Sequence, residues 1–165
     1  MEKDIYEAPA ATLDNAEISG SELASRWSRL AAALIDGLTV MTVTVPLMYF
    51  TGGFSGLAEG GQPSYSYLFL VTIVGIVAFL LIHGRSLARD GQTWGKRWLG
   101  IRIVTVDEAH ADIKTLSMRY GFFWLVPQIP IIGALINLVN MGFIFTPSKR
   151  CLHDHVAGTK VIRAH

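Results

Sequence analysis

Asp36 is the residue whose type and position most clearly point to chemistry, because it interrupts an apolar stretch that runs from Arg29 to Phe50. About 20 residues of helix span a bilayer, and a carboxylate within such a span costs about 2.5–3.5 kcal/mol on insertion scales. An acid at that depth is by default a candidate for binding a proton or a cation. The other interpretation is an ion pair that fixes helix packing, and the residues alone leave both open.

Arg29 and Asp154 are a candidate ion pair. Arg29 precedes Asp36 by seven residues, about 10 Å along a helix, so a carboxylate from elsewhere suits it better. Asp154 follows the last apolar region and would face Arg29 if the carboxyl tail lies on the same side of the membrane. The pair would then be short and bidentate; otherwise Asp154 is a solvated turn residue. We expect Arg29 to hold or gate the site, and Asp154 to share ion or proton binding with Asp36.

Three side chains of metal-ligating types surround Asp154 at a spacing of two: Cys151, His153 and His155. The sequence offers no second cluster to complete a set of four ligands, so we expect no bound metal. Histidines titrate near neutrality, so His153 and His155 could instead gate the site in response to pH.

Two further sets of polar side chains lie in or beside the apolar regions. The stretch 91–100 is not a phosphate loop, because Lys96 is followed by Arg97 rather than by Ser or Thr. We expect four of its side chains at headgroup depth near lipid phosphates: Trp94, Lys96, Arg97 and Trp98. Three amides in the third apolar region could bond between helices or line a hydrated cavity with Asp36: Gln128, Asn137 and Asn140.

The apolar runs predict the elements that position these residues. Residues 29–49 and 65–83 are long and apolar enough for two full transmembrane helices. The third region, 116–145, contains Pro127 and Pro130 and falls short of the roughly 40 residues that two full spans need. It is either one kinked span or a bent pair of half-helices, Leu116–Val126 and Ile131–Phe145.

We favour the bent pair, because it leaves the basic carboxyl tail on the cytoplasmic side. The tail also contains a predicted strand, Thr159–Arg163, whose obvious partner is the β-branched run Ile101–Val106. The predicted fold class is therefore an all-α integral membrane protein with two full spans, a bent third region and a small cytoplasmic β element. Residues 1–21 are expected to be a disordered polar tail, and residues 22–165 a single domain.

Composition supports a membrane protein and excludes several other classes. The 165 residues are 51% hydrophobic and 16% charged, with a mean hydropathy of +0.40, whereas a soluble domain carries about 25% charged residues. A net charge of +1 gives no reason to expect nucleic-acid binding. No nucleophile–base pair or cofactor loop is evident, so we expect neither an enzyme nor a cofactor. The loop 51–64 lacks Lys and Arg, whereas the segment 85–119 is rich in them, which predicts a multi-pass protein of the cytoplasmic (inner) membrane with a cytoplasmic amino terminus.

Three pieces of the sequence together resemble the RDD family of small membrane proteins: S-R-W-S-R-L-A-A-A-L-I-D-G, G-Q-T-W-G-K-R-W-L-G-I-R-I-V and C-L-H-D-H-V-A-G-T-K-V-I. The resemblance implies that the arginine and two aspartates for which the family is named are Arg29, Asp36 and Asp154. Trp94 stands where the family commonly has proline, and His155 where an apolar residue is usual. Transport is suspected for the family, and cation/proton antiport is attributed to some members.

We therefore expect a transporter that exchanges a monovalent cation for protons at Asp36. The competing hypothesis is a membrane scaffold or partner-binding subunit, in which Arg29, Asp36 and Asp154 are structural. One copy has few helices with which to enclose a pathway, so we expect a homo-oligomer or a membrane protein partner. The small-residue face of the first helix is a candidate interface.

Overall fold

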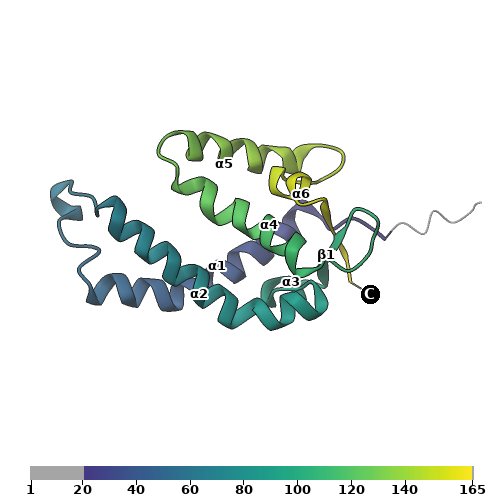
Figure 1. Cartoon of the computed structure of the whole chain (residues 1–165), viewed down its shortest axis with the longest axis horizontal. Helices are drawn as coiled ribbons and strands as arrows, with labels where there is room; N and C mark the ends of the chain where they lie inside the picture. Colours follow the sequence, from purple (N-terminus) through teal and green to yellow (C-terminus); the bar gives the residue numbers. More distant parts are fainter. Residues whose placement is uncertain (1–20, 165) are drawn as a thin grey trace, which may run out of the picture.

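Two long helices and a shorter helical hairpin meet at a small sheet in the computed structural model, which describes residues 21–164 (Figure 1). The predicted polar tail lies outside the described residues except for Ser21. Helix α1 covers Arg26–Phe50 and is capped by Ser25, whose hydroxyl accepts a hydrogen bond from the amide of Ser28. Helix α2 covers Tyr65–Asp90. Both helices are long and apolar enough to cross a membrane, as predicted.

Helix α2 continues two turns beyond its predicted end near His83. The extra turns are retained because His83 and Leu87 are both buried against the rest of the chain. The helix ends at Gly91, which adopts a left-handed conformation with φ 66° and donates its amide to the Leu87 carbonyl at 3.0 Å. A side chain there would be strained, so glycine is the natural residue to end this helix.

The third apolar region is a bent pair of helices, which agrees with the favoured prediction rather than with one kinked span. Helix α4 covers Ile113–Leu125, and a 3-10 turn, η2, covers Val126–Gln128. The chain then reverses into α5, Ile132–Gly142, and a final 3-10 turn, η3, Phe143–Phe145. The Arg26 guanidinium donates to the Ile144 carbonyl at 2.9 Å, so the end of the hairpin lies beside the start of α1.

The predicted strands form an antiparallel pair, β1 (Ile101–Thr105) and β2 (Thr159–Arg163), with Ile103 opposite Val161. Both of these side chains are buried. The segment that precedes α1 lies along the sheet, because the Ala24 amide donates to the Val161 carbonyl at 3.0 Å. The sheet thereby ties the start of α1 to the carboxyl tail.

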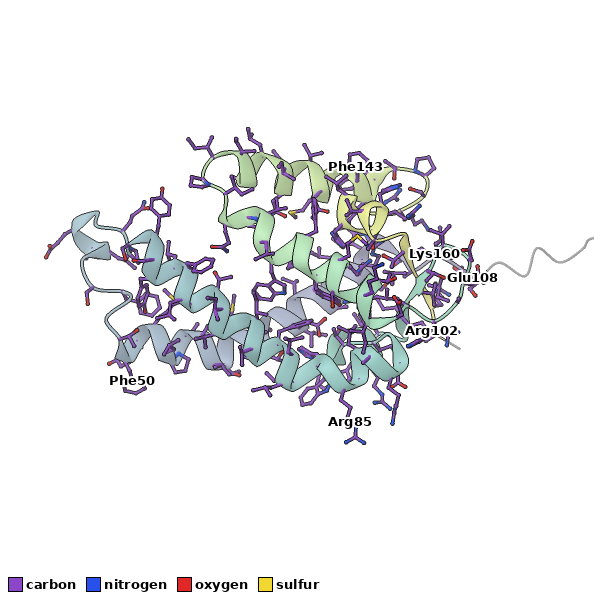
Figure 2. All side chains as sticks on the ribbon, in the orientation of Figure 1. Phe50, Arg85, Arg102, Glu108, Phe143 and Lys160 are labelled. Carbon is purple, nitrogen blue, oxygen red and sulfur yellow. The ribbon has the colours of Figure 1, made fainter. Side chains whose placement is uncertain are left out.

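Basic residues gather at the sheet end of the molecule. Figure 2 shows Arg85, Arg102 and Lys160 at that end, and Phe50 at the opposite end. Two short helices complete the sheet end: α3, Trp94–Trp98, and α6, Leu152–Val156. The loop 51–64, at the other end, contains no Lys or Arg. This distribution is the one expected for a membrane protein whose sheet end faces the cytoplasm.

Candidate functional site

Asp154 lies between two guanidinium groups and is fully buried. Its carboxylate forms ion pairs with Arg29 of α1 and with Arg119 of α4. The same carboxylate accepts from the Cys151 amide at 2.8 Å, which closes the first turn of α6. The hydroxyl of Thr159 accepts from Arg119 at 2.7 Å and lies 3.4 Å from Asp154. One carboxylate thus joins α1, α4, α6 and β2.

Arg29 therefore has the partner that the sequence predicts for it. It also donates to the Lys149 carbonyl, and its guanidinium lies 3.7 Å from the Cys151 thiol. Arg29 and Asp154 are on the same side of the fold, as the bent third region requires. The ion- or proton-binding role predicted for Asp154 stays a prediction, but every part of this carboxylate is already occupied by arginines, amide or hydroxyl.

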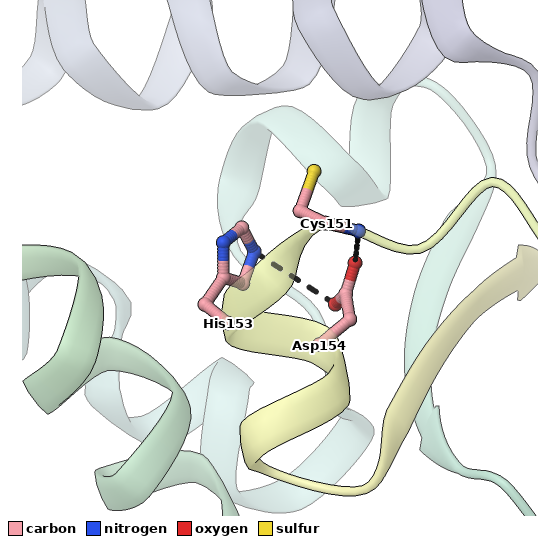
Figure 3. A group of neighbouring side chains, drawn as sticks. All are labelled: Cys151, His153 and Asp154. Carbon is pink, nitrogen blue, oxygen red and sulfur yellow. Dashed lines mark hydrogen bonds and ion pairs between the residues drawn. The ribbon is translucent and has the colours of Figure 1, made fainter. Parts of the chain in front are cut away.

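His153 is held in a defined orientation next to Asp154 (Figure 3). Its backbone amide and its ring Nδ1 both donate to the Asn140 side-chain oxygen, at 3.0 and 2.8 Å. Burial, together with the positive charges of Arg119 and Arg29, lowers the pKa of His153 to about 2. The imidazole is therefore neutral at physiological pH, and its 3.8 Å approach to the Asp154 carboxylate is not an ion pair.

Cys151, His153 and Asp154 bring one sulfur, one nitrogen and one oxygen within 4.8 Å of one another. Figure 3 shows the three side chains next to one another, with the His153 ring turned toward Asp154. These donor types suit zinc, but zinc would need the Asp154 oxygens that pair with two arginines. The positive charge of these arginines opposes a second cation at the same place. The arrangement therefore favours an internal ion-pair cluster over a metal centre.

Asp36 occupies a second polar cluster, where α1 meets α3. It is 7% exposed. Its carboxylate accepts hydrogen bonds from the Gly95 amide at 2.8 Å and from the Thr93 hydroxyl, both at the start of α3. The Lys96 ammonium lies 3.5 Å away. Asp36 thus supplies, from another helix, the acceptor and negative charge that a helix amino terminus favours.

His83 completes the Asp36 cluster from α2, with its Nε2 atom 3.9 Å from the Asp36 carboxylate. The ring Nδ1 accepts from the Trp94 amide at 3.3 Å, so the ring proton is on Nε2 and is donated to the Thr39 hydroxyl at 2.9 Å. Thr39 in turn donates to the Asp36 carbonyl. A carboxylate, an ammonium and an imidazole are therefore grouped within one helix–helix contact.

The residues predicted at headgroup depth, and His155, are exposed, except for Lys96. Trp94 and Trp98 are exposed, as interfacial anchors would be. Lys96 was predicted at the lipid surface, and this is wrong for its side chain: the ammonium turns inward because Asp36 provides a buried opposite charge. Arg97 is exposed, and so is His155, whose ring packs edge-on against Phe143.

The three amides do not share one cavity with Asp36. Gln128 and Asn137 line a pocket beside α2, whereas Asn140 is buried and bonded to His153. Asp36 does not line that pocket. The part of the prediction that placed all three amides with Asp36 is therefore wrong, because α5 turns Asn140 toward α6.

Four polar residues of the two clusters were not singled out from the sequence: His83, Thr93, Arg119 and Thr159. Arg119 had a usable signal, since it is a charged residue near the start of the third apolar region, as Arg29 is at the start of the first. His83 also ends an apolar run. The two threonines carry no comparable signal, because threonine is common in loops and strands.

Sequence comparisons find related proteins and a matching family model. An uncharacterized protein of Bacillus subtilis (strain 168), YckC, is 32% identical over 139 residues, which cover 84% of this chain and 83% of the relative. An uncharacterized protein of Haemophilus influenzae is 27% identical over 149 residues, covering 85% of this chain and 78% of the relative. No solved structure matches the chain. The family model described as "RDD family" matches residues 23–158, which include Arg29, Asp36 and Asp154, and the chain belongs to the RDD family.

Proposed function

We propose that the protein is a membrane transporter that exchanges a monovalent cation for protons at Asp36. The observation that carries the proposal is the grouping of the Asp36 carboxylate with Lys96 at 3.5 Å and His83 at 3.9 Å. A carboxylate in a membrane-length helix can hold either a proton or a metal cation, and competition between the two couples their movements. The Lys96 ammonium compensates the carboxylate charge when either ligand leaves, and it must withdraw when a cation binds, because the two positive charges oppose each other.

The Asp154 cluster has a different part in this proposal. Its two arginines pair with the carboxylate and hold it in place, so Asp154 stabilises the fold around Asp36 rather than binding the transported ion. We further propose that the sheet end faces the cytoplasm, in the inner membrane, and that two or more copies assemble to enclose the pathway. The protein then acts without a cofactor and catalyses no chemical reaction.

The experiment is exchange by purified protein in liposomes that enclose a pH-sensitive dye. An inward gradient of sodium or potassium should drive proton efflux with the wild-type protein. Asp36→Asn should abolish this efflux while remaining folded, because the asparagine oxygen can still accept from the Gly95 amide. Asp90→Asn is the matched control, since Asp90 is a surface carboxylate at the end of α2. Full exchange by Asp36→Asn would reject the mechanism.

A membrane scaffold is the second candidate, and the Asp154 cluster favours it, because one buried carboxylate joins four elements. In a scaffold both aspartates would serve only to hold segments together. Three neutralised variants separate the two candidates: Arg29→Leu, Asp36→Asn and Asp154→Asn. Loss of stable protein in all three favours the scaffold, whereas a stable but inactive Asp36→Asn favours transport.

A further inference from the structure

A pocket of about 210 Å³ lies between α2 and the tip of the α4–α5 hairpin. Its lining combines apolar rings with a hydroxyl and two amides: Thr72, Phe123, Trp124, Pro127, Gln128 and Asn137. The hairpin tip points away from the sheet, toward the end that carries the loop 51–64 (Figure 1). The pocket therefore offers polar groups beside the turn of the hairpin, and one of its walls, Phe123, packs against His153 next to Asp154.

The backbone at the hairpin tip gives an independent reason to expect water there. Helices α4 and α5 contain 13 and 11 residues, about 20 and 17 Å, which is short of a bilayer core of about 30 Å. A hairpin that enters from the sheet end therefore turns within the membrane. Its turn consists of the 3-10 turn η2 and the non-helical residues 129–131, and Ile131 has φ 63°. Non-helical backbone at membrane depth is tolerated only where protein covers it or a water-filled cavity adjoins it.

The pocket and the Asp36 cluster are connected along one face of α2. Thr72 lines the pocket, and His83 lies eleven residues further on, about 16 Å along the helix axis. Phe79 lies between them and is 5% exposed. Its ring centroid is 5.0 Å from that of His83 and 6.1 Å from that of Trp124, which also lines the pocket. The Phe79 ring thus lies between a residue that lines the pocket and a residue of the Asp36 cluster.

Two polar atoms beside Phe79 are buried and have no hydrogen-bond partner among residues 21–164: the Tyr120 hydroxyl and the Trp124 ring nitrogen. The Tyr120 ring centroid is 4.9 Å from that of Phe79. Buried polar groups are normally bonded, and an unbonded one costs free energy. Water in a passage past Phe79 would provide a partner for the Trp124 nitrogen, whereas the Tyr120 hydroxyl lies toward Arg119.

We propose that this pocket is the entrance through which a hydrated monovalent cation or a proton reaches Asp36 from the loop 51–64 side, and that Phe79 is the plug that closes the passage. This inference rests on the proposed exchange function and adds to it the route from the second side of the membrane. Gln128 and Asn137 would replace part of the hydration of the cation, since amide oxygens are suitable ligands for hard cations.

The entrance is tested by thiol labelling of single-cysteine variants in a Cys151→Ser background, which removes the one native cysteine. In vesicles, Asn137→Cys should react with a membrane-impermeant, positively charged methanethiosulfonate at least tenfold faster than Leu135→Cys. Leu135 is the matched control, because it lies on the same helix and is exposed on its apolar surface. Equal reaction rates for the two variants would overturn the proposal that this pocket is an entrance.

The plug is tested by Phe79→Ala in liposomes that hold a proton gradient without a cation gradient. The variant should dissipate the gradient several times faster than the wild-type protein, whereas Phe69→Ala, at a half-exposed position of the same helix, should not. If Phe79→Ala and the wild-type protein held the gradient equally long, the proposal that Phe79 closes the passage would be overturned. Neither readout needs coupled exchange, so loss of exchange in the wild-type protein would refute only the proposed function.

Discussion

Arg29 and Asp154 are separated by 125 positions in the sequence and form a buried ion pair in the fold. The pair joins the first helix, α1, to the last, α6, and Arg119 of α4 pairs with the same carboxylate. Buried charges of this kind are costly unless each is paired and hydrogen-bonded. Here the carboxylate meets both conditions, so removing it should leave two arginines without their counter-charge.

Asp154→Asn should therefore be among the most destabilising single substitutions in the chain. Removing one partner of a buried ion pair costs about 3–5 kcal/mol, because the remaining charge stays buried and uncompensated. We expect a large drop in the midpoint of thermal unfolding in detergent. Asp90→Asn, which removes a partly exposed carboxylate 2.9 Å from Arg89, should leave the midpoint unchanged. Equal midpoints for the two variants would contradict the structural role of Asp154.

The contact between α3 and α1 depends on the absence of a side chain at Gly95. A Cβ atom there would overlap the Ala32 carbonyl and lie 2.9 Å from the Asp36 carboxylate. Gly95→Ala should therefore separate the two helices and lower the thermal midpoint. The control is Gly84→Ala, whose Cβ would meet no atom within 4 Å. That change should be neutral or stabilise the helix by about 0.5–1 kcal/mol. Similar midpoints for both variants would contradict the packing.

Much of the architecture follows from patterns that a bilayer imposes on sequence. Two apolar runs of membrane length predict α1 and α2, and the β-branched run beginning at Ile101 predicts β1. The Arg29–Asp154 pair was predictable because an arginine at the start of a span needs an opposite charge. These inferences succeed because each depends on one segment or on a simple matching of charges.

The partners of Asp36 were not predictable in the same way. They come from α2, two turns before its end, and from α3, and the latter has the composition of an interfacial segment. Nothing in the sequence tells that Lys96 turns inward while Arg97 remains exposed, because both flank the same short helix. That choice depends on how α3 packs on α1, where Gly95 allows the backbone to approach.

The orientation of the fold in the membrane can be tested with two reporter cysteines in the Cys151→Ser background. Ser55 is exposed in the loop without basic residues, and Ala109 is exposed between β1 and α4, at the sheet end. We expect a membrane-impermeant maleimide to label Ser55→Cys in intact cells, and to label Ala109→Cys only after lysis, because basic segments stay in the cytoplasm. The opposite pattern would invert the proposed topology.

His153 should make the fold sensitive to mild acid. Burial, with the charges of Arg119 and Arg29, lowers its pKa from 6.5 to about 2 in the folded protein. The unfolded chain therefore binds a proton that the folded one excludes, and this contribution to stability is lost progressively as the pH falls below 6.5. The free energy of unfolding should decrease by at most about 1.4 kcal/mol per pH unit.

Thermal midpoints between pH 7 and pH 5 measure the effect. The wild-type midpoint should fall over this range, and the midpoint of His153→Gln should fall less. Glutamine acquires no charge and can still donate a hydrogen bond to the Asn140 oxygen that holds the imidazole. His110→Gln is the control, since His110 is exposed at the sheet end and should leave the pH dependence unchanged. A pH dependence in His153→Gln as steep as in the wild type would assign the acid sensitivity to other groups.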